Sequence, residues 1–583
     1  MSAFSFPRGT GHDSKAAPLA TARWSFTAPT WQSGHLWLGR DVHGQAIGHG
    51  DDRHAVIIAG SRSGKGRSAI IPNLFLWPGS ALVIDPKGEN ATVTAQARAS
   101  RPGHRVAVLD PRGAANVPEA FRVRFNPLVL IDPTSDDAID LAAAVGDALM
   151  LGSEDGKDIH WNESARGLFE AVLLHAAATQ NGASRSLVKV RQLLTLGDPA
   201  YADQLNSGLS EKEQPVSPFD ALWTAMGDSQ AVNPAVRDVI RGAAHTIADM
   251  GENERGSVLS TARRNTKFID SPWMRRCLEG NDGAAGSIDL DSFKAAPGGL
   301  TLYVCLPARF IPTHARFLRL VLNLVLYRME AQGLDKPTCG HPVLFVLDEF
   351  AALGRMEAIE KAAGLMAGYG VKLMPVLQDL GQLKRHYRES WETFLGNAGV
   401  LQFFANADLT TLEWLSKRMG QVELIRETQG SSEASTTGLS RSQSETQSGG
   451  WSRSSGTTKG NSDMAQLQSL ATKDGGSGLV PFLARAGASG RGTSEGWSDS
   501  EGVSGGTSQQ RGDSSSSGTS ATHSTSEGVH QAALMTPDEI ARFFDRKAGM
   551  QVALIDGLPV ALSRTNYDTD EAFAAFRNDG GRT

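Results

Sequence analysis

The sequence predicts an α/β protein with a mostly parallel sheet, an inserted all-α domain and a Ser/Gly-rich insertion, and three observations support this fold class. An apolar, β-type run at residues 55–59 leads into a loop of small residues that ends in Lys65, and a segment that can form a helix follows. A second apolar run at residues 343–347 ends in two carboxylates, which is typical of a buried central strand. Between these motifs, residues 134–297 carry helical spacing without strand-like alternation.

The loop that ends in Lys65 has the spacing Ala59-x-x-x-x-Gly64-Lys65 of a Walker A motif. Small residues let consecutive backbone N–H groups point at a phosphate, the lysine can reach the β and γ oxygens, and the following helix contributes its positive N-terminal end. The expected nucleotide contacts are Gly60, Ser61, Arg62, Ser63, Gly64, Lys65, Gly66, Arg67 and Ser68.

Gly66 stands where such loops usually have a Ser or Thr whose hydroxyl binds Mg²⁺. Two explanations follow. Either Ser68, another residue or water completes the metal shell, or the loop binds nucleotide more weakly than a standard one. A Gly/Ser turn with an incidental lysine is the competing interpretation of the whole motif, and the acidic strand end far downstream argues against it.

The acidic pair Asp348-Glu349 follows the second apolar run and has the form of a Walker B motif. We expect Asp348 to orient Mg²⁺ or its water and Glu349 to polarise the attacking water in phosphoanhydride hydrolysis. Two more predicted strands end in polar residues, Asp85 and Gln378, at the edge where a parallel sheet binds ligands. In RecA-like ATPases a polar residue in the position of Gln378 senses the γ-phosphate. A helix cap is the alternative role for both residues.

Composition allows a large folded protein and gives no sign of a global nucleic-acid field. With 583 residues the chain can hold two or three domains, and its formal charge of −6 means that any DNA contact must be local. The three cysteines, Cys277, Cys305 and Cys339, have no metal-ligand spacing and are expected to be buried thiols in a reducing compartment. We find no run of the roughly 20 apolar residues that a membrane span needs, and no signal peptide.

Composition and periodicity divide the chain into six segments. Residues 1–30 are a flexible arm, 31–133 the first part of a nucleotide-binding domain, 134–297 an all-α domain, 298–429 the second part of the nucleotide-binding domain, 430–529 a disordered Ser/Gly-rich segment, and 530–583 a C-terminal helix and hairpin that complete the nucleotide-binding domain.

The predicted all-α domain is acidic. Residues 134–300 contain 15 Lys and Arg against 24 Asp and Glu, so this part of the chain carries a charge of about −9. An acidic surface repels the phosphate backbone of a nucleic acid. We therefore interpret the domain as a docking surface for a protein. Arg263, Arg264 and Lys267 form a local basic spot that is more often a solvated helix face.

Residues 430–529 consist largely of Ser, Gly, Thr, Glu and Arg in repetitive runs. Such a segment cannot bury enough apolar area to offset the entropy of ordering it, so disorder is expected, with short local helices at residues 464–471 and 479–484. Order is expected to return at Thr536, which can cap a helix that has Pro537 in its first turn.

The order of these motifs resembles the type IV secretion coupling ATPases of the TraG/TraD kind. The matching pieces span residues 50–570. They are Ser63-Gly64-Lys65-Gly66, Ile71-Pro72, Trp77-Pro78-Gly79-Ser80, Asp85-x-Lys87-Gly88-Glu89, Phe125-Asn126-Pro127-Leu128, Leu347-Asp348-Glu349-Phe350-x-x-Leu353-Gly354, Gln378, Leu395-Gly396-Asn397 and Leu534-x-x-Pro537-Asp538-Glu539. Gly66 also occurs in this family.

The resemblance implies a RecA-like nucleotide-binding domain with an inserted all-α domain, and a homo-hexameric ring at the inner membrane. Such rings bind ATP and Mg²⁺ and hydrolyse ATP to pass relaxase-bound single-stranded DNA, or effector proteins, to the components of a type IV secretion channel. Family members usually begin with transmembrane helices, and this chain shows none. We therefore expect a cytoplasmic protein that is peripheral at the inner membrane through a separate membrane anchor.

A ring with nucleotide at its subunit interfaces implies that a neighbour's arginine completes each site. The candidates are Arg355, Arg385 and Arg418, and the sequence does not rank them. Two other functions remain open at this stage. One is a substrate adaptor that binds nucleotide with little ATPase activity, although Glu349 favours a motor. The other is an FtsK-like pump for duplex DNA, which the lack of a basic C-terminal domain disfavours.

Overall fold

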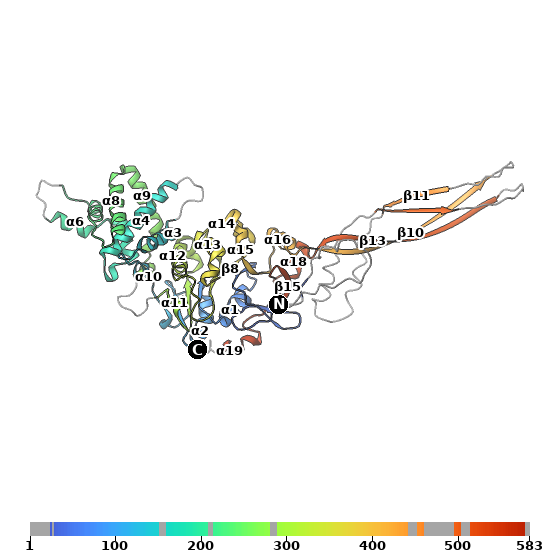
Figure 1. Ribbon diagram of the computed structural model, residues 1–583, viewed down its shortest axis with the longest axis horizontal. Helices are drawn as coiled ribbons and strands as arrows, with labels where there is room; N and C mark the ends of the chain where they lie inside the picture. Colours follow the sequence, from blue (N-terminus) through green and yellow to red (C-terminus); the bar gives the residue numbers. More distant parts are fainter. Residues whose placement is uncertain are drawn as a thin grey trace. The chain divides into compact units, whose positions relative to one another are not determined.

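The computed structural model describes residues 24–25, 28–150, 159–207, 214–279, 288–440, 452–459, 495–502 and 514–577 (Figure 1). The chain divides into two compact units. One consists of Ser25–Thr411 and Phe543–Thr583, and the other of Met1–Trp24 and Leu412–Arg542. Most of the arm predicted at residues 1–30, and the short helices predicted at 464–471 and 479–484, lie outside the described residues.

The first unit is built on an eleven-stranded sheet with the order β2-β1-β15-β14-β9-β3-β8-β7-β4-β6-β5. The seven strands from β9 to β5 run parallel, and the other four join them in antiparallel pairs, so the predicted mostly parallel sheet is confirmed. The strands are β1 (Leu36–Arg40), β2 (Ala46–His49), β3 (His54–Ala59), β4 (Ala81–Asp85), β5 (Arg105–Leu109), β6 (Leu300–Cys305), β7 (Val343–Leu347), β8 (Val371–Leu377), β9 (Ala398–Phe404), β14 (Met550–Ile555) and β15 (Leu558–Ser563).

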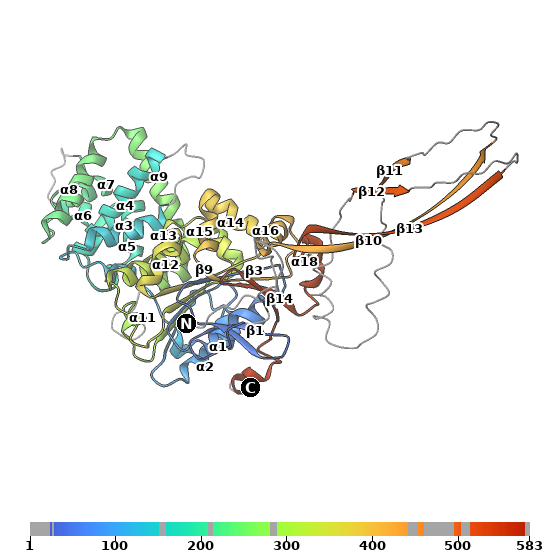
Figure 2. The ribbon, with the colours of Figure 1, turned by 45° about the vertical axis from the view of Figure 1, so that its right-hand side comes forward.

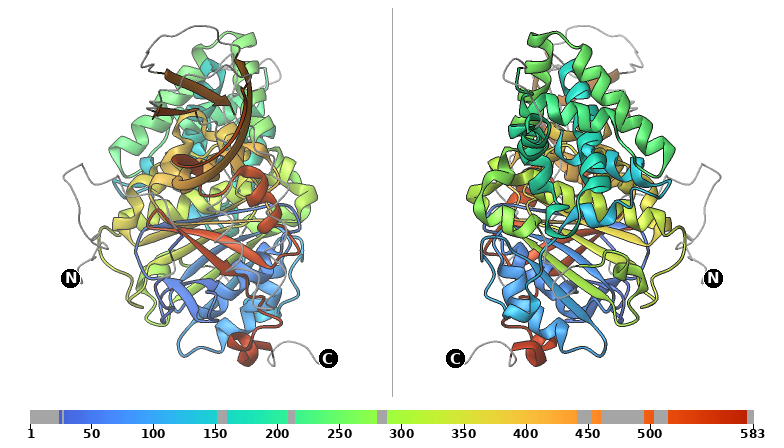
Figure 3. Two further views of the ribbon diagram at one scale, coloured as in Figure 1. Left: turned by 90° about the vertical axis from the view of Figure 1, so that its right-hand side faces the viewer. Right: turned by 90° about the vertical axis from the view of Figure 1, so that its left-hand side faces the viewer.

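The central strands are buried along their whole length because helices cover both faces of the sheet. Every residue of β3, β4, β7 and β8 is buried. Helices α1 (Ile71–Leu76) and α2 (Glu89–Ala99) lie on one face. Helices α12 (Ile311–Ala331), α13 (Glu357–Leu365), α14 (Leu380–Tyr387) and α15 (Trp391–Gly396) lie on the other (Figure 3). Crossovers that run in opposite directions along the sheet produce this division.

Between β5 and β6 the described chain is helical. The main helices are α3 (Ala138–Leu149), α4 (Ile159–Thr179), α5 (Leu187–Leu196), α6 (Pro199–Asn206), α7 (Pro218–Gly227), α8 (Pro234–Asp249), α9 (Glu252–Thr266), α10 (Pro272–Leu278) and α11 (Ser292–Ala295). Helix α4 contacts α3, α5, α8 and α9 (Figure 2), and α3 packs against α12 of the sheet layer. Through this contact the helices share one compact unit with the sheet, and the domain boundaries at 134 and 297 stay a prediction.

Helices α6, α7 and α10 have 8, 10 and 7 residues, and helices this short are marginally stable by themselves. Their starts nevertheless have a local cause. Asp198 and Ser217 each accept a hydrogen bond from a backbone N–H of the first turn of α6 and α7, and proline follows as the first helical residue.

The second unit contains a two-stranded antiparallel ribbon of β10 (Gln421–Ser440) and β13 (Ser514–Ala533), and a shorter one of β11 (Ser452–Lys459) and β12 (Glu495–Gly502). The residues of the Ser/Gly-rich segment that the structure describes belong to these ribbons, and the rest of the segment lies outside the described residues. Ladder hydrogen bonds join main-chain groups and need no apolar side chains. Helix α18 (Pro537–Phe543) begins as predicted, with Thr536 Oγ1 accepting from Glu539 N at 3.4 Å.

Two smaller expectations were also tested. Cys277 and Cys305 are buried as expected, whereas Cys339 is only partly buried because it lies in the turn before β7. Across the described residues, no helix combines the length and the apolar character that spanning a bilayer requires.

Arg98 joins the end of α1 to β6 and provides a test of this packing. Its guanidinium is fully buried and donates to the carbonyl oxygens of Leu74, Trp77 and Gly79, the last at 2.7 Å. We expect Arg98→Met to lower the free energy of unfolding by about 2–4 kcal/mol, because it removes the donor to the buried Gly79 carbonyl, whereas the Trp77 carbonyl also accepts from Arg101. Denaturant unfolding measures this loss. The same substitution at the exposed Arg276 should change stability by less than about 0.5 kcal/mol, and an equal loss in both variants would contradict this account.

A candidate nucleotide-binding site at the carboxyl edge of the sheet

The predicted site residues follow four strands that are neighbours in the sheet, in the order β3, β8, β7 and β4. The Walker A loop follows β3, Gln378 follows β8, the acidic pair follows β7, and Asp85 is the last residue of β4. The chain leaves β3 toward one face of the sheet and leaves β7 and β8 toward the other. The carboxyl ends of strands at such a change of direction are where parallel sheets bind ligands.

The structure brings the lysine and the acidic pair into direct contact. Lys65 Nζ lies 2.8 Å from Glu349 Oε1 and 3.0 Å from Asp348 Oδ1. Gln378 Nε2 donates to the other carboxylate oxygen of Glu349 at 3.1 Å. Asn406, which the sequence analysis did not single out, donates from Nδ2 to the Gln378 carbonyl at 3.2 Å. The predicted catalytic residues therefore form one hydrogen-bonded group, while their individual roles stay predictions.

Both charged partners of this contact keep their charge. Burial favours the neutral form of Lys65, but the charges of Asp348 and Glu349 outweigh it and raise the pKa of the ammonium above its usual value. Burial also disfavours ionised Glu349, yet the hydrogen bonds from Lys65 and Gln378 hold the pKa of its carboxyl below the usual value. Glu349 has a left-handed backbone, with φ of 55°, which marks a sharp turn directly after the strand.

The Walker A loop needs glycine for two different reasons. A Cβ on Gly60 would lie 1.9 Å from the carbonyl oxygen of Ala405, so no side chain fits there. Gly64 has φ of 90°, a conformation that L side chains rarely adopt. After the lysine the chain enters a π-helical turn over Gly66–Ile70. In this turn the Ser68 hydroxyl donates to the Gly64 carbonyl at 3.1 Å, so the structure shows it bonded within its own turn.

The other predicted loop contacts differ in exposure. Ser61, Arg62 and Arg67 are exposed, Gly66 is half-buried, and Ser63 is buried. The Ser63 hydroxyl is buried and has no hydrogen-bond partner among the described residues.

Asp85 is buried and faces the start of α2. Its Oδ2 accepts from the backbone N–H of Ala91 at 2.8 Å, and its Oδ1 accepts from Asn90 Nδ2 at 3.4 Å. Burial, with a smaller contribution from the charge of Asp348, raises the pKa of Asp85 to about 7. The helix-capping role that the sequence analysis left open is thus present, next to the acidic pair. Its role toward nucleotide stays a prediction.

The three arginine-finger candidates lie in different places. Arg355 is exposed and pairs with Glu360 at 3.3 Å. Arg385 lies on α14, and Arg418 lies on α16 (Leu409–Met419). A cavity of about 970 Å³ between α3, α12, α13 and α14 is lined by Arg355 and Arg385 but by none of the predicted nucleotide contacts.

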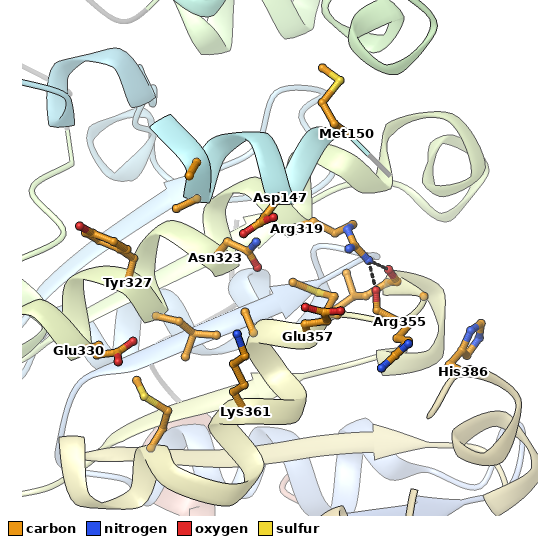
Figure 4. Close-up of a pocket in the computed structure, with 18 of the residues that line it drawn as sticks. Asp147, Met150, Arg319, Asn323, Tyr327, Glu330, Arg355, Glu357, Lys361 and His386 are labelled. Atoms are coloured by element: carbon orange, nitrogen blue, oxygen red, sulfur yellow. Dashed lines mark hydrogen bonds between the residues drawn. The ribbon is translucent and has the colours of Figure 1, made fainter. Parts of the chain in front are cut away.

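Arg319 of α12 lines the same cavity (Figure 4) and reaches the segment after the acidic pair. Its Nη1 donates to the carbonyl oxygens of Leu353 at 2.8 Å and Arg355 at 2.6 Å. The guanidinium is largely buried and forms no ion pair within the described ranges. It therefore holds the backbone a few residues beyond Glu349 by hydrogen bonds to carbonyls.

One other group of metal-ligand types occurs in the described part of the chain. His49, Asp51 and Asp556 have donor atoms within 4.8 Å of one another at the β1–β2 side of the sheet. The Arg53 guanidinium pairs with both carboxylates. This arginine already supplies the positive charge that a cation would bring, so the group is interpreted as an internal ion-pair cluster.

The chain has the features of RecA-like P-loop proteins. These are a mostly parallel sheet, a Walker A loop and a Walker B strand end, and the loop and the strand end meet at one edge of the sheet. Within this class, the chain belongs to the family described as type IV secretory system conjugative DNA transfer, whose model matches residues 16–450.

The conjugal transfer protein TraG of Escherichia coli is 28% identical over 433 residues, which cover 71% of this chain and 60% of that protein. The type IV secretion system-coupling protein VirD4 of Bartonella quintana is 26% identical over 381 residues, covering 63% of this chain and 53% of that protein. The chain thus spans between about half and three fifths of the length of these curated relatives.

A solved structure of the bacterial conjugative coupling protein TrwBdeltaN70, in a trigonal form in complex with sulphate, has a TM-score of 0.53 and 12% sequence identity. The likeness covers 94% of this chain and 95% of that one, and it shows that the two share a fold.

The contact between Gly60 and Ala405 predicts the effect of a single methyl group. We expect Gly60→Ala to displace the Walker A loop and to weaken nucleotide binding at least about ten-fold, because a Cβ cannot lie 1.9 Å from a carbonyl oxygen. Titration with a fluorescent ATP analogue measures the affinity. Gly242→Ala on α8 is the matched control, since this glycine lies outside the site and a Cβ there meets nothing within 4 Å. Equal affinity of the Gly60→Ala variant and the wild type would contradict the prediction.

The raised pKa of Asp85 predicts a pH-dependent stability. Its folded pKa of about 7 lies above the ordinary value of 3.8, so the folded state binds the proton more tightly than the unfolded state. The resulting stabilisation is complete below about pH 4 and is lost as the pH rises through 7. We expect Asp85→Asn to raise the thermal midpoint at pH 8, with a difference from wild type that shrinks toward pH 5. A difference that grows toward pH 5 would refute this.

Proposed function

We propose that this chain is an ATP-hydrolysing coupling protein that drives conjugative transfer. The observation that carries the proposal is the contact of the Lys65 ammonium with both Asp348 and Glu349, at 3.0 Å or less. A phosphate-binding lysine and the two carboxylates of a metal and a water site must lie this close to act on one magnesium nucleotide. Family membership supports the same assignment.

The donor set fits ATP and Mg²⁺. The backbone N–H groups of residues 64–66 and the Lys65 ammonium suit phosphate oxygens, whereas the N–H groups of Gly60 and Ser63 donate to carbonyls within the protein. The Asp348 carboxylate suits Mg²⁺, which prefers oxygen ligands. When bound, Mg²⁺ neutralises the charge that develops on the phosphates. With ATP and Mg²⁺ bound, Lys65 would contact a phosphate and Asp348 would be a ligand of the cation. These contacts would replace the present contact between Lys65 and Asp348.

Glu349 is the group that orients and polarises the attacking water. Its carboxyl has a lowered pKa and is therefore ionised at neutral pH, so it can accept a hydrogen bond from water. Gln378 holds one of its oxygens at 3.1 Å and thereby fixes the direction of the other. Gln378 follows the neighbouring strand β8. If phosphate release changes the contacts of Gln378, its hydrogen bond to Glu349 changes as well.

Family membership supports the cargo and the assembly described next, and both are part of the proposal. The chain recruits relaxase-bound single-stranded DNA, protein substrates, or both, and passes them to a type IV secretion channel. It acts as a homo-hexamer in which an arginine from the neighbouring subunit, Arg355, Arg385 or Arg418, completes each site. It works at the inner membrane.

The test is ATP turnover with and without single-stranded DNA. We expect Lys65→Ala and Glu349→Gln each to lower the turnover number at least about 100-fold, because they remove the phosphate contact and the water-polarising group. Glu349→Gln should keep its affinity for a fluorescent ATP analogue, whereas Lys65→Ala should lose it. Lys267→Ala, an exposed lysine of the helical region, is the control and should turn over as wild type.

Wild-type turnover in both site variants would remove the motor proposal. Nucleotide binding by the wild-type chain without DNA-stimulated turnover would instead favour the adaptor. The oligomer mass, measured by light scattering with and without ATP, decides whether a hexamer forms.

A further inference from the structure

Arg564 connects the C-terminal hairpin to the Walker A loop. It directly follows β15, about 500 residues beyond the loop, and its Nη1 donates to the carbonyl oxygen of Ser63 at 2.6 Å. Its Nη2 donates to the carbonyl oxygen of Arg546 at 2.9 Å. The guanidinium lies over the ring of Phe404 at the end of β9, with 5.2 Å between its central carbon and the ring centroid. Arg564 is therefore held in place from several sides.

The contact with Ser63 determines the direction of a backbone donor in the loop. The Ser63 carbonyl and the Gly64 N–H belong to one planar trans peptide, so the two groups point in opposite directions. When Arg564 holds this carbonyl on its own side, it aims the Gly64 N–H toward the opposite side. A phosphate-binding loop needs this arrangement, with carbonyls outward and N–H groups inward. Residue 64 tolerates this orientation of the peptide because it is a glycine, which adopts a φ of 90° without strain.

The same terminal segment holds the loop on the other side of Lys65. The Arg67 guanidinium forms an ion pair with Asp568, and the backbone N–H of Tyr567 donates to the Arg67 carbonyl at 3.0 Å. Residues 564–568 thus contact the chain two positions before and two positions after the lysine. A loop rich in Gly and Ser loses much conformational entropy when it binds phosphate, and contacts that order it beforehand reduce this cost.

We propose that Arg564 is a positioning residue for nucleotide binding, which holds the Ser63–Gly64 peptide in its phosphate-binding orientation. The ligand class is the phosphate chain of a nucleoside triphosphate. The inference rests on the proposed function, because it assumes that the Walker A loop binds nucleotide. It goes further in assigning part of the affinity to a segment that lies at the far end of the chain.

Two variants of Arg564 test the proposal. Arg564→Met keeps the length of the apolar stem and removes both donors, and Arg564→Lys keeps the charge but cannot hold the carbonyls of Ser63 and Arg546 in one planar fork. We expect the Kd for a fluorescent ATP analogue to rise about ten-fold in the Met variant and about three-fold or more in the Lys variant, since a charge-assisted hydrogen bond is lost. The KM for ATP should rise in parallel, while kcat at saturating ATP changes less than about two-fold.

Arg546→Met is the matched control. This arginine is exposed, and its contact with Arg564 uses only the backbone carbonyl, which the substitution keeps. It should bind and turn over ATP as wild type. Thermal unfolding without nucleotide, measured for all variants, separates a loss of affinity from a loss of folded protein.

The outcomes decide between the alternatives. Wild-type affinity in the Lys variant overturns the positioning role, and it does so even if the Met variant does not fold. A kcat that falls while KM stays unchanged also overturns it, because that result places Arg564 in a later step. If the wild-type chain itself binds no nucleotide, the proposed function fails, and this failure is distinct because it appears before any variant is compared.

Discussion

The ion pair of Lys65 with Asp348 and Glu349 is the interaction on which the site depends. Three groups from two distant parts of the chain meet within 3.0 Å because only β8 separates β3 from β7 in the sheet. The strand between them contributes Gln378, which completes the group from the middle. If several strands separated β3 from β7, the same side chains would lie too far apart to share a ligand.

The direction of the chain through the sheet brings the two motifs to one edge. The β3–β4 and β4–β5 crossovers put α1 and α2 on one face, and the return from β6 to β9 puts α12 to α15 on the other. The Walker A loop and the acidic pair therefore reach the carboxyl edge from different sides of the sheet, and Lys65 contacts both carboxylates there. The helical insertion leaves the sheet at β5 and re-enters at β6, at one end of the strand order, where it does not interrupt the central strands.

Much of the fold was predictable because its signals are local. Continuous apolar runs such as 343–347 are buried strands, and a loop of small residues before a lysine is visible in a window of ten residues. Other features were not predictable from such windows. A window of a few residues does not show that Arg319 of α12 binds the carbonyls of Leu353 and Arg355, because those residues lie in a different part of the chain.

By itself, the sequence determined which chemical groups this protein has and at which strand ends they stand: a lysine after one strand, carboxylates after two others and an amide after a fourth. Only the tertiary structure decided which of them touch. It placed the Asp85 carboxylate against the start of α2 and brought Arg564 to the Ser63 carbonyl across about 500 residues. Propensity and periodicity act over a few residues, whereas the neighbours of a parallel strand come from distant parts of the chain, and the burial of the whole sheet selects them.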